Sequence, residues 1–382
     1  RLVGSEMCIR DSSMGSGALF SIYKGKNDQD SLRSAIVHAF ALIMAVTVLL
    51  NVLVYIGIDP ILHFLRVPDE VWDGMKAYLL VIFAGIIATS LYNYFSCLLR
   101  ALGNSTIPLV FLAVSAVLNI GLDLLFVAVL PWGIRGAALA TVIAQYVSGI
   151  GITLYVLLKC RDLLPSREDL QFNRQILGEI GNLSSMTCVQ QSVMNFGILM
   201  VQGLVNSFGP VIMAAFAAAV KIDTFAYLPV QDFGNAYSTF IAQNYGAGKK
   251  DRIRKGTRES FLISFLFCIV ISAVVCIFAA PLMRIFVSAK ETAVIASGVR
   301  YLRIEGAFYC GIGCLFLLYG YYRAVKKPGM SVILTVISLG TRVALAYILS
   351  AYIGETGIWM AIPIGWVLAD VTGLAYMKFQ EK

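Results

Sequence analysis

Charged residues are scarce in this sequence. Asp, Glu, Lys and Arg make up 14% of its 382 residues, against about 25% in an average soluble domain. Apolar residues make up 59%, and the mean hydropathy is +0.80. So few polar side chains cannot cover the surface of a water-soluble fold, which excludes a soluble enzyme, a disordered chain and a small secreted domain held by disulfides. Most of the chain is therefore expected to lie in a lipid bilayer.

The residues that usually build catalytic or metal centres are also few. The two histidines, His38 and His63, leave little for histidine catalysis. The eight cysteines show no Cys-x-x-Cys spacing and lie mostly in apolar runs, which predicts free, buried thiols. The short loop 246–248 lacks the Gly-Lys-Ser/Thr ending of a phosphate-binding loop. We therefore expect no metal, no cofactor and no ATP-driven motor.

Ten apolar stretches are long enough to cross a hydrocarbon core of roughly 30 Å, which takes about 20 helical residues. Their length favours helices over barrel strands, which have only about ten residues. Pro229 lies inside one of the longest stretches, where we expect a kink or a local opening. The ten predicted spans are residues 32–57, 74–98, 107–129, 136–158, 176–206, 211–242, 260–288, 297–321, 331–352 and 358–377.

The loops between these spans differ in charge. Alternate loops carry nineteen Lys and Arg residues, and the loops on the opposite side carry seven. Cytoplasmic loops of membrane proteins hold the excess of cations, so the basic loops are expected to face the cytoplasm across the inner (plasma) membrane. The formal net charge of +8 is thus explained by topology, and we expect no nucleic-acid partner.

A weak internal repeat relates the two halves of the chain at an offset of about 223 residues. Five short matches keep this offset to within two residues, and the clearest pairs residues 25–28 (GKND) with 248–251 (GKKD). Matching loops lie on the cytoplasmic side in both copies, so the repeat is parallel, with its axis along the membrane normal. The sequence therefore predicts an all-α polytopic membrane protein of two six-helix lobes.

The first copy of the repeat is incomplete. Subtracting the offset from residue 176 places its start before residue 1, so the first helix and most of the second are expected to be missing. Residues 1–12 (RLVGSEMCIRDS) are polar where the repeat requires a membrane helix, and we interpret them as a sequence artefact. The predicted division is 13–158 for the incomplete N-terminal lobe, 159–175 for a cytoplasmic linker and 176–382 for the C-terminal lobe.

Several stretches outside this segment carry a family resemblance. They are GSGALFSIYKGKND (15–28), LLRALGNSTIPL (98–109), LNIGLDLLF (118–126), GIRGAALATVIAQ (133–145), QQSVMNFG (190–197), KIDTFAYLPVQDFGNAYSTFIAQNYGAGKKDR (221–252) and GTRVALAYILSAYIGETGIWMAIPIGW (340–366).

These motifs resemble the bacterial branch of the multidrug and toxic compound extrusion (MATE) family. The resemblance implies a twelve-helix fold that exports bulky, often cationic organic compounds, driven by an inward Na⁺ or H⁺ gradient. Two departures concern the coupling ion. The first helix, whose acidic residue is central in many relatives, is absent, and Gln191 stands where some relatives carry a glutamate.

Charged groups inside membrane spans cost at least a few kcal/mol each and are candidates for function. Burial and a nearby cation act in opposite directions on a carboxyl group, which makes Glu305 the strongest candidate for binding a cation or proton. A static ion pair of Glu305 with Lys221 or Arg342 is the alternative. For Arg342 and Asp370 a structural ion pair is favoured. The candidates for ion coupling are Glu305, Asp223, Lys221 and Asp123.

Polar residues of the span 176–206 fall within about 60° of one another on a helix. Such a stripe favours the wall of a water-filled cavity between the lobes, and hydrogen bonding between packed helices is the alternative. Asn119 shares a face with Asp123, and aromatic rings such as Tyr227, Phe225 and Tyr309 attract organic cations, although packing is their commoner role. The candidate cavity residues are Gln191, Asn195, Gln202, Asn206, Asn119 and Tyr227.

The function predicted by these features is secondary active antiport of organic cations or drugs by a monomer in the lipid bilayer. A flippase for lipid-linked oligosaccharides is the alternative, but it would be expected to line its cavity with several cations that hold pyrophosphate. Within the spans only Lys221 and Arg342 are cationic, against five carboxylates. A membrane enzyme would need paired acidic or histidine motifs, which the spans lack.

Overall fold

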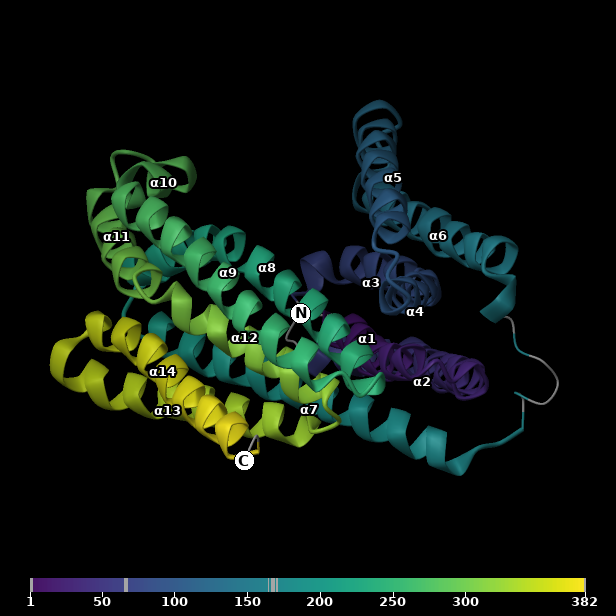
Figure 1. The fold of residues 1–382 in the computed structure, drawn as a ribbon. Coiled ribbons are helices and arrows are strands. Elements are labelled where there is room, and N and C mark those ends of the chain that lie inside the picture. The colour runs from purple at the N-terminus through teal and green to yellow at the C-terminus, as the bar shows by residue number, and fades with distance from the viewer. Residues whose placement is uncertain (1–2, 65–67, 164, 166–168, 170, 381–382) are drawn as a thin grey trace. The chain divides into compact units, whose positions relative to one another are not determined.

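The computed structural model describes residues 3–64, 68–163, 165, 169 and 171–380, and in this part of the chain every regular element is a helix (Figure 1). The chain divides into two compact units, of which unit 1 ends at Cys188 and unit 2 begins at Val189. The boundary lies inside a helix, because the first half of that helix packs on unit 1. This division differs from the predicted one, in which the second lobe starts at residue 176.

Unit 1 contains five long helices, one helix broken in two, and two short irregular turns. Its elements are α1 (Val3–Lys26), α2 (Gln29–Phe64), α3 (Asp69–Ala84), α4 (Ile86–Ala101), α5 (Thr106–Asp123), the π-helical turn η1 (Leu124–Val129), α6 (Gly133–Lys159), the 3₁₀ turn η2 (Arg161–Leu163) and the first half of α7 (Arg174–Asn206).

Unit 2 begins with the second half of α7. Its further elements are α8 (Pro210–Gly246), α9 (Lys250–Ile277), α10 (Ala279–Phe286), α11 (Thr292–Gly306), α12 (Tyr309–Ala324), α13 (Pro328–Ile353) and α14 (Glu355–Gln380). Helices α13 and α14 form an antiparallel pair along their length (yellow in Figure 1).

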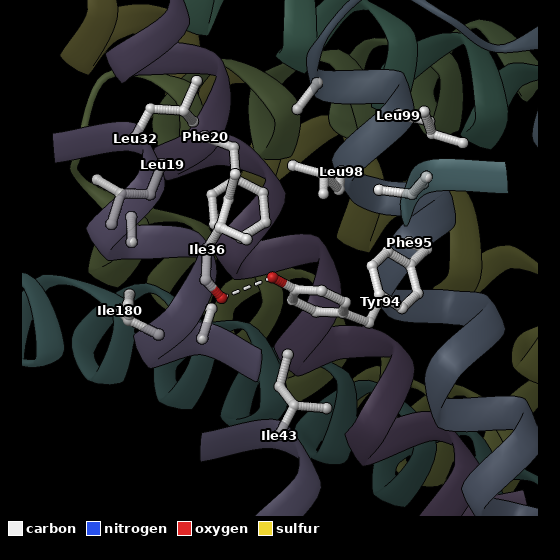
Figure 2. Close-up of a cluster of buried hydrophobic side chains, with 14 of the residues drawn as sticks. Leu19, Phe20, Leu32, Ile36, Ile43, Tyr94, Phe95, Leu98, Leu99 and Ile180 are labelled. Carbon is white, nitrogen blue, oxygen red and sulfur yellow. Dashed lines mark hydrogen bonds between the residues drawn. The ribbon is translucent and has the colours of Figure 1, made fainter. Parts of the chain in front are cut away.

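The core of unit 1 lies where α1, α2, α4 and the start of α7 meet. Phe20 from α1 and Tyr94 from α4 form an edge-to-face pair with ring centroids 6.1 Å apart. The Tyr94 hydroxyl donates to the Ile36 carbonyl oxygen of α2 at 2.6 Å, as Figure 2 shows. Ile180 of α7 is fully buried in the same cluster. Burial of a tyrosine ring with its hydroxyl satisfied is the favourable case for a polar aromatic side chain.

The two units repeat the same sequence of elements. Helices α3 and α4 begin at residues 69 and 86, and α11 and α12 begin exactly 223 residues later. The packing corresponds as well, since α4 packs on α1, α2 and α6, and α12 packs on α8, α9 and α14. The repeat seen in short sequence matches is therefore a repeat of helices and of their contacts.

The number of membrane spans agrees with the prediction. Nine helices of the described residues are long and apolar enough to cross a membrane, and the bent pair α11–α12 brings the number to ten. The predicted all-α polytopic membrane fold is confirmed.

The predicted span 297–321 is not one straight helix. It bends by 52° between α11 and α12, where the chain turns at Ala307 and Phe308 and the Phe308 amide donates to the Glu305 carbonyl at 3.0 Å. The expectation of a single uninterrupted span was wrong, because no proline or polar run marks this break. Its counterpart in unit 1 is Gly85, between α3 and α4.

Two other local expectations concern a proline and the first residues. Helix α8 continues through Pro229 without a break in its assignment, so the predicted local opening is not seen there. Residues 3–12 form the first turns of α1 together with residues 13–26, and Ile9 and Asp11 are buried. A helical form does not decide where these residues come from, so their interpretation as an artefact stays a prediction.

Candidate functional site

The two most buried carboxylates of unit 2 come from different helices and lie together. Asp223 of α8 is 3% exposed and Glu305 of α11 is 7% exposed. Electrostatic interaction and a side-chain hydrogen bond join them. The Tyr309 hydroxyl, from the first residue of α12, donates to Oδ1 of Asp223. We call Asp223, Glu305, Tyr301, Tyr309 and Arg342 the acidic cluster.

The bend between α11 and α12 builds this cluster. Glu305 lies in the last turn of α11, and Tyr309 begins α12. In a straight helix, residues four apart would stack on one face. Here the 52° bend lets Tyr309 approach Asp223 of α8 while Glu305 stays in the same pocket of charge. Breaks in spanning helices are tolerated where protein surrounds them, and both residues are buried in unit 2.

Tyr301 is fixed by two other aromatic rings. It is 2% exposed, and its ring lies edge-on to Trp359 of α14 with centroids 4.9 Å apart. Phe216 of α8 stacks on the other side of Trp359 at 5.4 Å and meets Tyr301 at 5.5 Å. With its ring held in this way, the Tyr301 hydroxyl interacts with both carboxylates of the cluster.

One cation acts on this pair of carboxylates. Arg342 of α13 interacts electrostatically with both Asp223 and Glu305, and it is half-buried. Oxygen Oδ2 of Asp223 and oxygen Oε2 of Glu305 are buried with no hydrogen-bond partner among the described residues. The cluster therefore has acceptor oxygens to spare and one positive charge for two acids.

The structure separates other residues that the sequence grouped with Glu305. Lys221 is exposed on α8, and its Nζ lies 5.9 Å from the ring centroid of Phe286. It is two residues from Asp223, which on a helix is about 200° around the axis, so the two side chains leave α8 on different sides. Of the two predicted ion-pair partners for Glu305, the structure brings Arg342 to it and not Lys221.

The predicted structural ion pair of Arg342 with Asp370 is not formed. Asp370 of α14 is 8% exposed, and the ion pairs found among the described residues do not include it. Its side-chain hydrogen bond is with the Cys314 thiol of α12. The expectation was wrong because Arg342 faces the acidic cluster, where two carboxylates attract it.

In unit 1 the predicted polar pair on α5 has one partner that the sequence did not suggest. Asn119 donates from Nδ2 to the Thr141 hydroxyl of α6 at 3.4 Å. Asp123 is half-buried at the end of α5, directly before the π-helical turn, and its Oδ1 has no hydrogen-bond partner among the described residues. Thr141 carries no distinguishing signal, since threonine is common in helices of this kind.

The polar stripe on α7 is divided between the two units. Ser184 is buried and donates to the Ser12 carbonyl at 3.0 Å within unit 1. Gln191 and Asn195 are half-buried in unit 2. Near the end of the helix, Gln202 donates to Asn206 at 2.9 Å, and Asn206 is exposed. The interpretation of the stripe as a cavity wall stays a prediction.

The remaining aromatic candidate packs inside unit 2. Tyr227 of α8 is half-buried, and its ring centroid lies 6.3 Å from that of Phe316 of α12. In the described part of the chain, no three His, Cys, Asp or Glu side chains are grouped so that they could hold a metal ion.

Comparison with known proteins gives the same family at every level. The MatE family model matches residues 11–125 and 185–348. The chain is 28% identical over 362 residues to the probable multidrug resistance protein YpnP of Bacillus subtilis, covering 94% of this chain and 80% of the relative.

A second relative is the probable multidrug resistance protein NorM of Thermotoga maritima, which is 25% identical over 381 residues, covering 96% of this chain and 79% of the relative. Among solved structures, an outward-facing multidrug resistance MATE family transporter of the MOP superfamily superposes with a TM-score of 0.93 at 21% identity, covering 99% of this chain and 85% of that one. The repeated helices, the sequence motifs and these matches together show that the chain belongs to the MatE family of multidrug and toxic compound extrusion transporters.

Proposed function

We propose that this protein is a secondary active antiporter that exports organic, often cationic compounds or drugs in exchange for Na⁺ or H⁺ bound at the acidic cluster. Its place is the inner (plasma) membrane, with the basic loops in the cytoplasm, and it works as a monomer without a cofactor. The relatives named as multidrug resistance proteins support this class of cargo. They do not support the alternative of an oligosaccharide flippase.

The charge balance of the acidic cluster is the observation that carries the proposal. When Asp223 and Glu305 are both ionised, Arg342 neutralises one of the two negative charges. A buried, uncompensated charge is expensive, so the cluster gains free energy by taking up one monovalent cation. Na⁺ prefers oxygen ligands, and a proton binds a carboxyl oxygen. The unpartnered oxygens Oδ2 of Asp223 and Oε2 of Glu305 offer a place for either.

The same balance links ion binding to conformation. Asp223 lies on α8, Glu305 on α11, Tyr309 on α12 and Arg342 on α13, so one bound cation changes the forces between four helices. A ligand shifts a conformational equilibrium only through its different affinity for the two states. A cluster made of several helices, with a bend at its centre, provides such a difference when those helices move.

The test is transport by the Glu305→Gln variant of the full-length protein. Glutamine keeps the shape of the side chain and removes its charge, so the cluster no longer lacks a cation. We expect efflux of ethidium or norfloxacin from cells, driven by separate Na⁺ and H⁺ gradients, to fall to the level of cells without the protein. The gradient that supports efflux in the unmodified protein identifies the coupling ion.

Glu259→Gln is the matched control. Glu259 is exposed on α9, and its nearest cation is Lys255 at 3.9 Å, so this variant should transport normally. Membrane insertion of both variants is checked by quantifying protein in purified membranes. Normal gradient-driven efflux by Glu305→Gln would remove the acidic cluster from ion coupling.

A further inference from the structure

A second buried carboxyl group of unit 2 lies where α12 and α14 approach each other closely. Gly311 of α12 makes this approach possible, because a Cβ atom there would lie 3.3 Å from the Cβ of Trp366 and 3.6 Å from Oδ2 of Asp370. Further along, Tyr322 of α12 donates to the carbonyl oxygen of Gly373 on α14 at 2.6 Å. The tight packing of these helices holds Asp370 in the interior of the unit.

The environment of Asp370 offers one weak hydrogen-bond donor. The side chain is 8% exposed, and its Oδ1 is buried with no hydrogen-bond partner among the described residues. The Cys314 thiol of α12 is hydrogen-bonded to the carboxyl group, and a thiol is a weak donor. The other neighbours are apolar, including Trp366, one turn earlier on α14, and the backbone of Gly311.

Charged and titratable groups on the surrounding helices are occupied elsewhere. Helix α14 packs against α11, α12 and α13. The cation on α13 is Arg342 and the acid on α11 is Glu305, and these two interact with each other and with Asp223. On α12, Tyr319 is hydrogen-bonded to Thr335 and acts on Asp370 through its charge distribution alone.

We propose that Asp370 and Cys314 form a second site in unit 2 whose ligand is a proton, separate from the acidic cluster. An ionised Asp370 would be a buried charge without a cation, which costs several kcal/mol in a protein interior. The protonated carboxyl is neutral and costs far less to bury. It still accepts the hydrogen bond from Cys314. Asp370 therefore holds a proton in the folded protein, while the acidic cluster has Arg342 to compensate part of its charge.

This inference does not rest on the proposed transport function, because proton occupancy is measured without substrate. The test is infrared spectroscopy of the purified protein in lipid at neutral pH, which detects the C=O stretching band of protonated carboxyl groups. We expect the spectrum to contain such a band and Asp370→Asn to remove it. Glu305→Gln should leave this band in place, and so should Asp232→Asn, which changes an exposed aspartate of α8.

A second variant reports on the site if Asp370→Asn does not fold. Cys314→Ser replaces the thiol with a hydroxyl, a stronger donor, and should shift the carbonyl band of Asp370 to lower frequency without removing it. Three results would overturn the proposal. They are an unchanged band in Asp370→Asn, no shift in Cys314→Ser, or a carboxylate band from Asp370 in its place, with or without Na⁺.

Discussion

At the scale of single residues, the hydrogen bond from Tyr309 to Asp223 sets the position of the acid on α8. Asp223 is almost fully buried, and Tyr309 is itself 3% exposed. A hydrogen bond to a charged, buried acceptor is stronger than an ordinary one, because water cannot replace the lost donor. The hydroxyl therefore holds Asp223 in the cluster and carries part of the desolvation cost of the carboxylate.

Removing this hydroxyl should destabilise the protein. Tyr309→Phe keeps the ring and deletes the donor, and we expect the free energy of unfolding in detergent micelles to fall by about 1.5–3 kcal/mol, the usual worth of a hydrogen bond to a charged group. Tyr352→Phe is the matched control, because Tyr352 is 83% exposed and should change stability little. Equal stability of the two variants would show that Asp223 is satisfied without Tyr309.

The sequence predicted the acids of this cluster better than their partners. Asp223 and Glu305 are recognisable because charges are rare inside spans. Tyr301 was not recognised, and Tyr309 was considered only as an aromatic contact for substrate, because most tyrosines in such a chain serve packing. Lys221 was grouped with Asp223 on the basis of depth, but depth along a helix does not fix the side from which a residue leaves it.

At the scale of helices, glycine pairs decide how closely the segments of unit 2 pack. Gly320 of α12 faces Gly234 of α8, and a Cβ atom at position 320 would lie 2.6 Å from the Gly234 carbonyl oxygen. A backbone atom cannot turn aside as a flexible side chain can. The two helices are therefore in backbone contact at this point, beside the residues that connect to the acidic cluster.

Gly320→Ala should force α8 and α12 apart. We expect a loss of about 1–3 kcal/mol in the free energy of unfolding, the usual cost of adding a methyl group to a packed interior. Gly340→Ala on α13 is the control, because a Cβ atom there meets nothing within 4 Å and alanine favours a helix over glycine by up to about 1 kcal/mol. Thermal unfolding in the same detergent measures both. A neutral Gly320→Ala variant would contradict the packing at this contact.

Helix existence could be predicted from sequence, but helix breaks could not. Long apolar runs identify spans because the hydrocarbon core fixes their length. The bend between α11 and α12 has no proline, while Pro229 lies in an unbroken helix. Neighbouring helices determine whether a backbone break is satisfied, and that information is not local. The matching break at Gly85 could be found only by applying the repeat to the structure.

At the scale of the whole molecule, the repeat and the loop charges make one joint statement about topology. Each unit orders its helices in the same way, with α3–α4 and α11–α12 starting 223 residues apart. An even number of crossings separates one copy from the next only if equivalent loops lie on the same side of the membrane. Loop charge then decides which side that is.

Four single-cysteine variants test both statements, in a background without native cysteines. Lys26→Cys and Lys249→Cys lie in equivalent loops of the two copies, and Glu70→Cys and Lys290→Cys lie near the opposite ends of the spans. All four positions are exposed. In intact cells, an impermeant maleimide added outside should label positions 70 and 290 and leave 26 and 249 unlabelled until the cells are opened.

The pattern of labelling separates the two parts of the argument. If positions 26 and 249 were labelled on opposite sides, the repeat would be inverted, and the correspondence of helices between the units would need another origin. If both were labelled from outside and 70 and 290 from inside, the repeat would stand, but the loop charges would not set orientation. Because the basic loop 249–258 holds six cations, and each resists transfer across the membrane, position 249 should stay inside.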